Sequence, residues 1–217
     1  MKNLDNREVV SVFTGDGRFI AGLEKSGLEI LICHEADKTM LRKLRAAKRQ
    51  VLAEPAGKSL GQRVLRMAGR QPGEIFLLYS CPEILRPDSI DSPFQYFLRV
   101  LTYIQPRFFI LDCPAEVLTV SAVNRDGNLA NVTVFESILP LFSRRSYDVL
   151  YGIYNAMSYG CPEAYMRFIL TGARDYDDTK RLYIPEPYTC NLRRNADPRV
   201  YLGRVLGQML QDAVENK

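Results

Sequence analysis

Residues 8–37 read EVVSVFTGDGRFIAGLEKSGLEILICHEAD, and this stretch decides the fold class. It begins with a β-branched and aromatic run at residues 8–13, which stops at a turn that holds two glycines. Residues 19–25 then space their apolar side chains as a helix does, and residues 28–33 form a continuous apolar run. Such a run is typical of a strand buried on both faces, so the order strand, glycine turn, helix, strand predicts a parallel sheet.

The same alternation of strand and helix patterns continues to the end of the chain. Only a polar, turn-rich segment at residues 172–194 interrupts it. We expect one α/β domain over residues 1–217, built on a doubly wound, mostly parallel, Rossmann-like sheet with helices on both faces. Strands are predicted at residues 51–53, 75–79, 108–111, 147–153 and 166–171, and helices at 39–49, 59–68, 94–104, 132–142 and 200–214.

Composition narrows the class of protein. The 217 residues are 47% hydrophobic and 25% charged, which is ordinary globular composition. The net charge of +4 allows a polyanionic partner without demanding one. The five cysteines lie far apart without zinc-ligand spacing, so neither a metal site nor a disulfide framework is predicted. No secretory signal or membrane-length apolar run is seen, and we expect an intracellular, cytoplasmic protein without membrane contact.

Four loops follow predicted strands and are expected to meet. In doubly wound sheets, ligands bind beyond the carboxyl ends of the strands. The loops at residues 14–18, 34–37, 80–82 and 112–114 each leave such an end. The sequence therefore predicts that these loops converge on one site.

The first two of these loops carry a pattern that suits a nucleotide-like ligand. Gly15 and Gly17 let the backbone approach a ligand closely, because they have no Cβ. Glu35 directly follows the second strand, where a carboxylate accepts hydrogen bonds from ribose hydroxyls in nucleotide-binding folds. The alternative is that Glu35 and Asp37 only cap the helix that begins near Lys38. Both interpretations stay open on these residues alone.

A basic cluster lies in the predicted helix after this acidic loop. Its cations suit contacts with phosphates, but charges that spread around a helix are more often a solvated face, and we favour that interpretation here. The cluster consists of Arg42, Lys43, Arg45, Lys48 and Arg49.

The glycine turn and the acidic loop resemble the opening motifs of the cytosine C5 methyltransferases, which use S-adenosylmethionine. Those enzymes open with F-x-G-x-G-G, and Phe13, Gly15 and Gly17 match it, whereas Arg18 stands at the third glycine. Residues 34–37 (HEAD) stand for the family's N-E-x-D signature. Later segments are similar in the same order, so the resemblance covers nearly the whole chain. They lie at residues 105–118, 146–174 and 195–210.

The resemblance implies a cofactor and the residues that hold it. The cofactor is S-adenosyl-L-methionine, bound in a class I methyltransferase fold. Glu54, after the weak third strand, stands where the family's acidic residue meets the adenine amino group. The expected cofactor-binding residues are Phe13, Gly15, Gly17, Glu35, Glu54 and Asn195.

The resemblance also implies a catalytic set. In the family, a cysteine thiolate adds to cytosine C6, a glutamate protonates N3 and C5 takes the methyl group; the thiolate suits the first step because it is a strong nucleophile. Cys81 stands at the family's P-P-C-Q motif, although a shift of one or two positions puts Pro82 or Glu83 there, and a buried structural cysteine is the alternative. Asp112 stands at the glutamate, and Arg167 at an arginine that orients the base and the nucleophile.

Departures from the family pattern leave two functions open. Glu163 and Tyr165 replace the glutamine and first arginine of Q-x-R-x-R, which predicts a raised thiol pKa. The family's target-recognition insertion is essentially absent between residues 175 and 194. We therefore expect a methyltransferase that acts on a nucleic acid or cytosine nucleotide, with a separate recognition subunit or as a homo-oligomer. The alternative is a catalytically inactive relative that serves as a binding or regulatory subunit.

Overall fold

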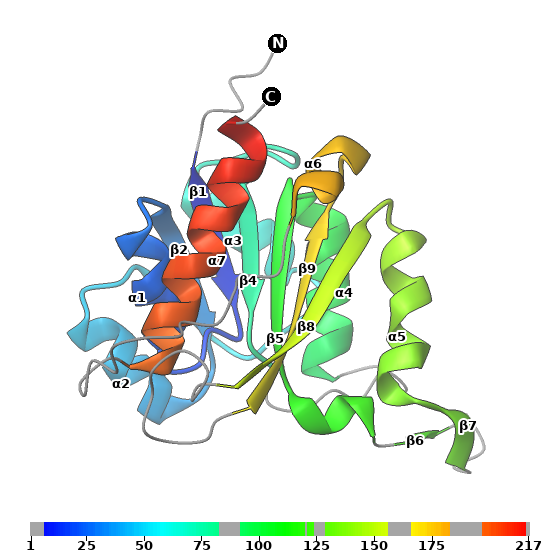
Figure 1. Cartoon of the computed structure of the whole chain (residues 1–217). Coiled ribbons are helices and arrows are strands. Elements are labelled where there is room, and N and C mark those ends of the chain that lie inside the picture. Colours follow the sequence, from blue (N-terminus) through cyan, green and yellow to red (C-terminus); the bar gives the residue numbers. More distant parts are fainter. Residues whose placement is uncertain are drawn as a thin grey trace.

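Strands and helices alternate along the chain much as the sequence predicts (Figure 1). The computed structural model describes residues 7–82, 92–119, 121–123, 129–155, 166–182 and 197–215. The strands are β1 (Glu8–Val12), β2 (Glu29–Glu35), β3 (Val51–Ala53), β4 (Leu77–Ser80), β5 (Phe108–Pro114), β6 (Ser121–Val123), β7 (Leu129–Thr133), β8 (Asp148–Asn155) and β9 (Met166–Ala173). The helices are α1 (Arg18–Lys25), α2 (Lys38–Ala46), α3 (Leu60–Ala68), α4 (Pro93–Ile104), α5 (Val134–Ser143), α6 (Tyr176–Arg181) and α7 (Pro198–Glu215), with a 3-10 turn at Ala115–Leu118.

Seven strands form one sheet in the order β3-β2-β1-β4-β5-β9-β8. The four strand pairs β3–β2, β2–β1, β1–β4 and β4–β5 are parallel. The last strand in sequence, β9, lies between β5 and β8 and is antiparallel to both. The predicted class, an α/β, doubly wound and mostly parallel sheet, is confirmed.

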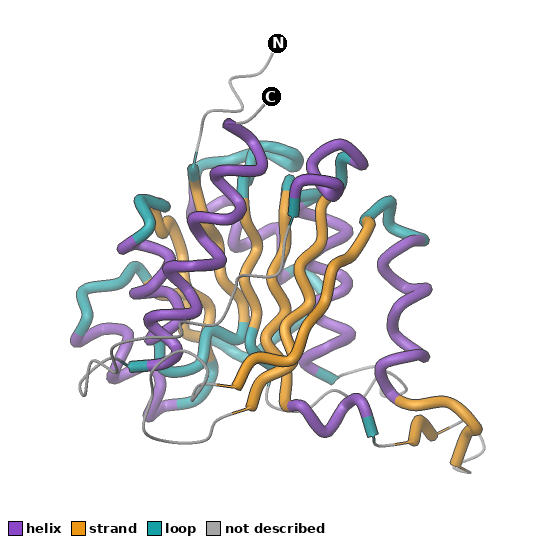
Figure 2. The backbone as a smooth tube through the Cα atoms, viewed as in Figure 1, coloured by secondary structure: helices purple, strands orange, loops and turns teal. Residues whose placement is uncertain are grey.

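Helices cover both faces of the sheet, with α1, α2 and α7 on the face turned to the viewer in Figure 1 and α3 and α4 behind it (Figure 2). Neighbouring strand residues point to opposite faces. Val9 and Phe108 belong to the core on the α1 and α7 side, whereas Val10 and Phe109 belong to the core on the α3, α4 and α5 side. All four are fully buried, and burial of each such side chain contributes about 1.5–3 kcal/mol.

Helices α1 and α7 pack closely enough to exclude side chains at their crossing. A Cβ built on Gly22 would lie 2.2 Å from the carbonyl oxygen of Val200, and one on Gly203 would lie 2.2 Å from that of Phe19. This contact brings the first turn of α7 next to the glycine turn that precedes α1.

Two helices differ from the prediction. The segment expected to be only turns contains α6, whose first turn is capped by Asp175 and whose Asp178 is fully buried. Arg107 donates to both Asp178 carboxylate oxygens, at 2.6 and 2.8 Å, so an ion pair replaces the apolar face by which a helix is recognised. The helix predicted to reach residue 49 ends at Ala46, since Lys48 has a φ of 56°, outside the helical range.

A β6–β7 hairpin was also not predicted. No helix in the described part of the chain is both long and apolar enough to span a membrane.

Candidate active site

The carboxyl ends of four neighbouring parallel strands lie at the same edge of the sheet, and β5 continues beyond the others to Pro114. Val12 of β1 pairs with His34 of β2 and with Ser80 of β4, and Ser80 pairs with Leu111 of β5. The loops after these strands therefore leave the same edge of the sheet. The four predicted segments thus lie at one edge of the sheet, although residues 112–114 belong to β5 and not to a loop.

The glycine turn after β1 has an unusual backbone. Phe13 has a φ of 53°, which is costly for a bulky residue, and Gly15 and Gly17 have φ of 67° and 78°. A Cβ on Gly15 would meet nothing within 4 Å, whereas one on Gly17 would lie 2.7 Å from Cδ2 of Leu44 in α2. Gly17 thus lets α2 pack on the turn, and Gly15 leaves open space beside it. Backbone strain of this kind concentrates at functional sites.

Glu35 holds this turn. Its Oε2 accepts from the backbone N–H of Gly15 at 2.9 Å, and its Oε1 accepts from those of Ala36 and Asp37 at 2.8 and 3.1 Å. Asp37, by contrast, caps α2 through Thr39 and Met40. Of the two interpretations, helix capping therefore applies to Asp37, whereas Glu35 joins the ends of β1 and β2.

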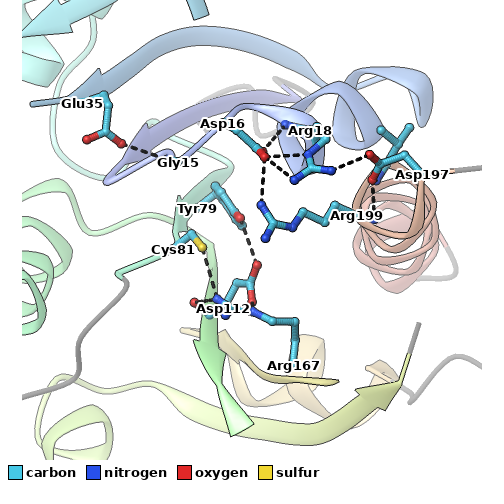
Figure 3. A network of polar contacts seen from close by, with 11 residues as sticks. Gly15, Asp16, Arg18, Glu35, Tyr79, Cys81, Asp112, Arg167, Asp197 and Arg199 are labelled. Atoms are coloured by element: carbon cyan, nitrogen blue, oxygen red, sulfur yellow. Dashed lines mark hydrogen bonds and ion pairs between the residues drawn. The ribbon is translucent and has the colours of Figure 1, made fainter. Parts of the chain in front are cut away.

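Three predicted catalytic residues meet at the end of β4 (Figure 3). The backbone N–H of Cys81 donates to the carbonyl of Phe13 at 3.0 Å, which ties the thiol to the glycine turn. Nη2 of Arg167 lies 3.3 Å from Sγ of Cys81, and its Nε donates to Oδ1 of Asp112 at 2.5 Å. The hydroxyl of Tyr79 donates to the other Asp112 oxygen at 3.3 Å.

Burial governs the charges of this cluster. It raises the pKa of Cys81 to about 12, with the Asp112 carboxylate adding to the rise while the cations of Arg167 and Arg199 oppose it. Burial also raises the pKa of Asp112, again against Arg167 and Arg199. The predicted effect of Glu163 and Tyr165 on the thiol pKa stays a prediction, because both lie outside the described residues. A carboxyl group with a raised pKa suits proton donation.

A charged network that the sequence did not indicate closes the site on the α7 side. Arg18 donates to Asp16 at 2.6 Å through Nε and to Asp197 at 2.9 Å through Nη1. Arg199 donates to the same Asp16 carboxylate at 3.0 Å, and Asp197 accepts from the N–H of Arg199 at the start of α7. In the sequence Arg18 stood out only as a departure from the third glycine of the opening motif, and nothing there pointed to its partners.

The remaining predicted site residues are placed as follows. Glu54 follows β3, where its carboxylate pairs with Arg63 at 2.6 Å and its carbonyl contacts Nε2 of His34 at 3.0 Å. Its role at a cofactor stays a prediction. Asn195 and Glu83 lie outside the described residues. Within the part of the chain that the structure describes, no three His, Cys, Asp or Glu side chains gather as a metal site requires.

Two type II methyltransferases match most of the chain in sequence. Type II methyltransferase M.FnuDI of Fusobacterium nucleatum is 28% identical over an alignment of 195 residues, which covers 83% of this chain and 51% of that protein. Type II methyltransferase M.NgoPII of Neisseria gonorrhoeae is 27% identical over 177 residues, covering 77% and 48%. The chain thus spans about half the length of these relatives. No protein-family model matches it.

Solved structures show the same fold. A putative DNA modification methyltransferase encoded within an E. coli prophage superposes with a TM-score of 0.61 at 16% identity, over 86% of this chain and 52% of the other. A Spodoptera frugiperda DNMT2 mutant gives a TM-score of 0.56 at 13% identity, over 88% and 53%.

Proposed function

We propose that this chain, a divergent relative of the cytosine C5 methyltransferases in sequence and fold, binds S-adenosylmethionine and methylates C5 of cytosine in a nucleic acid or a nucleotide. One observation carries the proposal. A thiol, a buried carboxyl group and a guanidinium gather within hydrogen-bonding distance of one another, beside a glycine turn at the carboxyl edge of the sheet.

The described residues suit the cofactor. The space beside Gly15 lies next to Glu35, whose carboxylate carries more acceptor sites than its three backbone partners use. Phe13 offers an aromatic ring at the same turn, and the half-buried ring packs edge-on against His34 at 5.4 Å. We assign Phe13, Gly15, Gly17 and Glu35 to the adenosyl part of the ligand, and Glu54 and Asn195 as further contacts. The cofactor supplies an electrophilic methyl group.

The cluster after β4 suits the nucleotide chemistry. The sulfur of Cys81 adds to C6 of cytosine as a proton from Asp112 reaches N3, and this addition makes C5 nucleophilic. Arg167 stabilises the thiolate form of Cys81 and holds the Asp112 carboxyl in place. Once C5 carries the methyl group, the C5 proton passes to solvent water, and the electrons of the C5–H bond form the C5–C6 double bond as the sulfur leaves C6. N3 then returns its proton to Asp112, which restores the cytosine ring, the Asp112 carboxyl group and the Cys81 thiolate. A separate recognition subunit or a second copy of the chain would supply further substrate contacts.

A second candidate function is that of a catalytically inactive binding or regulatory subunit. The high pKa of Cys81 favours it, because very little thiolate exists near neutral pH. The Arg18 network favours it too, since cations and carboxylates occupy a turn that is glycine-rich in the family.

Calorimetry tests cofactor binding separately from methyl transfer. Titration of the purified protein with S-adenosylmethionine should show saturable binding; no heat at millimolar cofactor would remove the methyltransferase proposal. Methyl transfer is then assayed on cytidine nucleotides, single-stranded DNA and RNA, and duplex DNA. Binding without transfer to any of them would favour the inactive subunit.

A further inference from the structure

The strongest asymmetry of charge lies on α2 and the turn that follows it. Residues 38–49 hold six of the 29 lysines and arginines and none of the 25 acidic residues. The rest of the chain, with 23 bases against 25 acids, is therefore net −2, and the whole positive charge of +4 comes from this stretch. A concentration of one sign in so short a segment is the electrostatic footprint of a polyanion-binding surface.

Most of these cations point to solvent and have no carboxylate partner. We call Lys38, Arg42, Lys43, Arg45 and Lys48 the α2 basic face; each side chain is exposed. In the described part of the chain, no ion pair joins any of the five to an acidic residue, whereas Arg49 pairs with Glu24. Solvated helix faces commonly mix both signs of charge, and this one carries only one.

Three cations of the α2 basic face lie in a row along the helix. Lys38, Arg42 and Arg45 follow at intervals of four and three residues, so they stack along one side of the helix, whereas Lys43 lies on another side. The row spans about 10 Å of helix axis. A nucleic acid strand presents one phosphate per about 3.4 Å of duplex axis, so the row is about as long as three phosphate steps.

The opposite side of α2 fixes its position relative to the candidate site. Leu44 is 1% exposed and packs against Gly17 of the glycine turn, and the helix begins directly after the loop that holds Glu35. The α2 basic face is thus the outer surface next to the cofactor loops. The site itself offers little free cationic charge to a polyanion, because its arginines, Arg167, Arg18 and Arg199, bind carboxylates.

We propose that the α2 basic face binds the phosphate backbone of a nucleic acid, without reading its sequence, and so holds a strand beside the candidate active site. The partner rests on the proposed function, which makes a nucleic acid the substrate. The binding step itself needs neither the cofactor nor the thiol. Phosphate contacts of this kind would provide part of the substrate binding from within the chain itself.

The test measures binding of a fluorescein-labelled 24-base-pair DNA duplex, and of the matching single strand, by anisotropy from 25 to 200 mM NaCl without cofactor. The triple variant R42Q/K43Q/R45Q removes three exposed charges from α2. Its matched control, K25Q/R66Q/R144Q, removes three exposed charges from other helix ends. The variant R42K/R45K keeps the charge and reports on side-chain shape alone.

The wild type, the control and R42K/R45K should bind alike, because they keep the α2 charge. The α2 triple variant should bind at least about tenfold more weakly at 50 mM NaCl, and its slope of log K against log [NaCl] should be shallower by up to about 2.7. Equal slopes for the two triple variants, or no binding by the wild type at 25 mM NaCl, would overturn the proposal. If the wild type binds DNA with the expected salt dependence but transfers no methyl group, that result would count against the proposed function and not against this surface.

Discussion

The guanidinium of Arg167 lies 3.3 Å from the sulfur of Cys81 and forms an ion pair with the carboxylate of Asp112. Its strand, β9, is the last of the sheet in sequence, yet it lies directly beside β5, where Arg167 pairs with Pro114. One side chain therefore connects β4, β5 and β9 at the candidate site. Asp112 is buried and Cys81 is half-buried, and burial raises the pKa of both groups, so the cation of Arg167 is the main group that opposes this effect.

Loss of Arg167 should destabilise the fold and the thiolate together. Arg167→Gln leaves the buried Asp112 carboxylate without its cation, so we expect the free energy of unfolding in urea at pH 8 to fall by about 3–5 kcal/mol. The pKa of Asp112 is raised in the folded protein, so the loss should be smaller at pH 4, where the protonated group is uncharged, and should grow as pH rises through that pKa. Arg167→Lys should retain part of the stability. An equal loss at both pH values would contradict this role.

Alkylation should reveal the high pKa of Cys81. With a pKa of about 12, the rate of iodoacetamide labelling at Cys81, followed by peptide mass spectrometry, should rise about tenfold per pH unit from 7 to 10 without a plateau. Arg199→Gln removes a cation that lowers this pKa, so labelling at pH 9 should slow further. Arg204→Gln, on the same helix and stacked over Tyr201, is the control and should leave the rate unchanged. A plateau below pH 9 would show that the thiol is already activated.

Glu35 should matter for the cofactor more than its neighbour does. Glu35→Gln puts an amide donor against the N–H groups of Gly15, Ala36 and Asp37, and it weakens acceptance from ribose hydroxyls. A hydrogen bond to a charged group contributes about 1.5–3 kcal/mol, so the dissociation constant for S-adenosylmethionine should rise about 10- to 100-fold. Asp37→Asn keeps a helix cap and should bind as the wild type does. Calorimetry on both variants decides, and equal affinities would remove Glu35 from the cofactor site.

The crossing of α1 and α7 should tolerate no added methyl group. The Cβ of Gly203→Ala would lie 2.2 Å from the Phe19 carbonyl, so the helices must separate, and overpacking of this kind costs about 1–3 kcal/mol. Gly57→Ala is the control, because its Cβ would lie 3.6 Å from Arg63 and its φ needs no glycine. Thermal unfolding should show a lower midpoint for Gly203→Ala only. Unchanged stability in both variants would mean that the crossing is looser than described.

Much of the sheet could be predicted because its central strands are short runs of mostly apolar residues. β1 and β4 are buried along their whole length, and such runs stand out in the sequence. The site loops followed, since carboxyl ends of parallel strands share an edge. The insertion of β9 between β5 and β8 could not be predicted, because strand order in a sheet depends on long-range packing.

Most polar contacts of the site could not be predicted from the sequence. Arg18 and Asp197 lie 179 positions apart, and no local pattern joins them. Tyr79 was predicted only as part of an apolar strand, although its hydroxyl donates a hydrogen bond to Asp112. The left-handed backbone of Phe13 was hidden too, because glycine rather than phenylalanine usually signals that conformation.

Covalent trapping shows whether Cys81 is the nucleophile that adds to cytosine. The protein is incubated with S-adenosylmethionine and single-stranded or duplex DNA that contains 5-fluorocytosine, which cannot lose its C5 substituent as a proton, and adducts are mapped by mass spectrometry. The account predicts a cofactor-dependent adduct on Cys81 that disappears in Cys81→Ser, while that variant still binds the cofactor. A protein that binds cofactor and DNA but yields no adduct, or yields one on another residue, would contradict it.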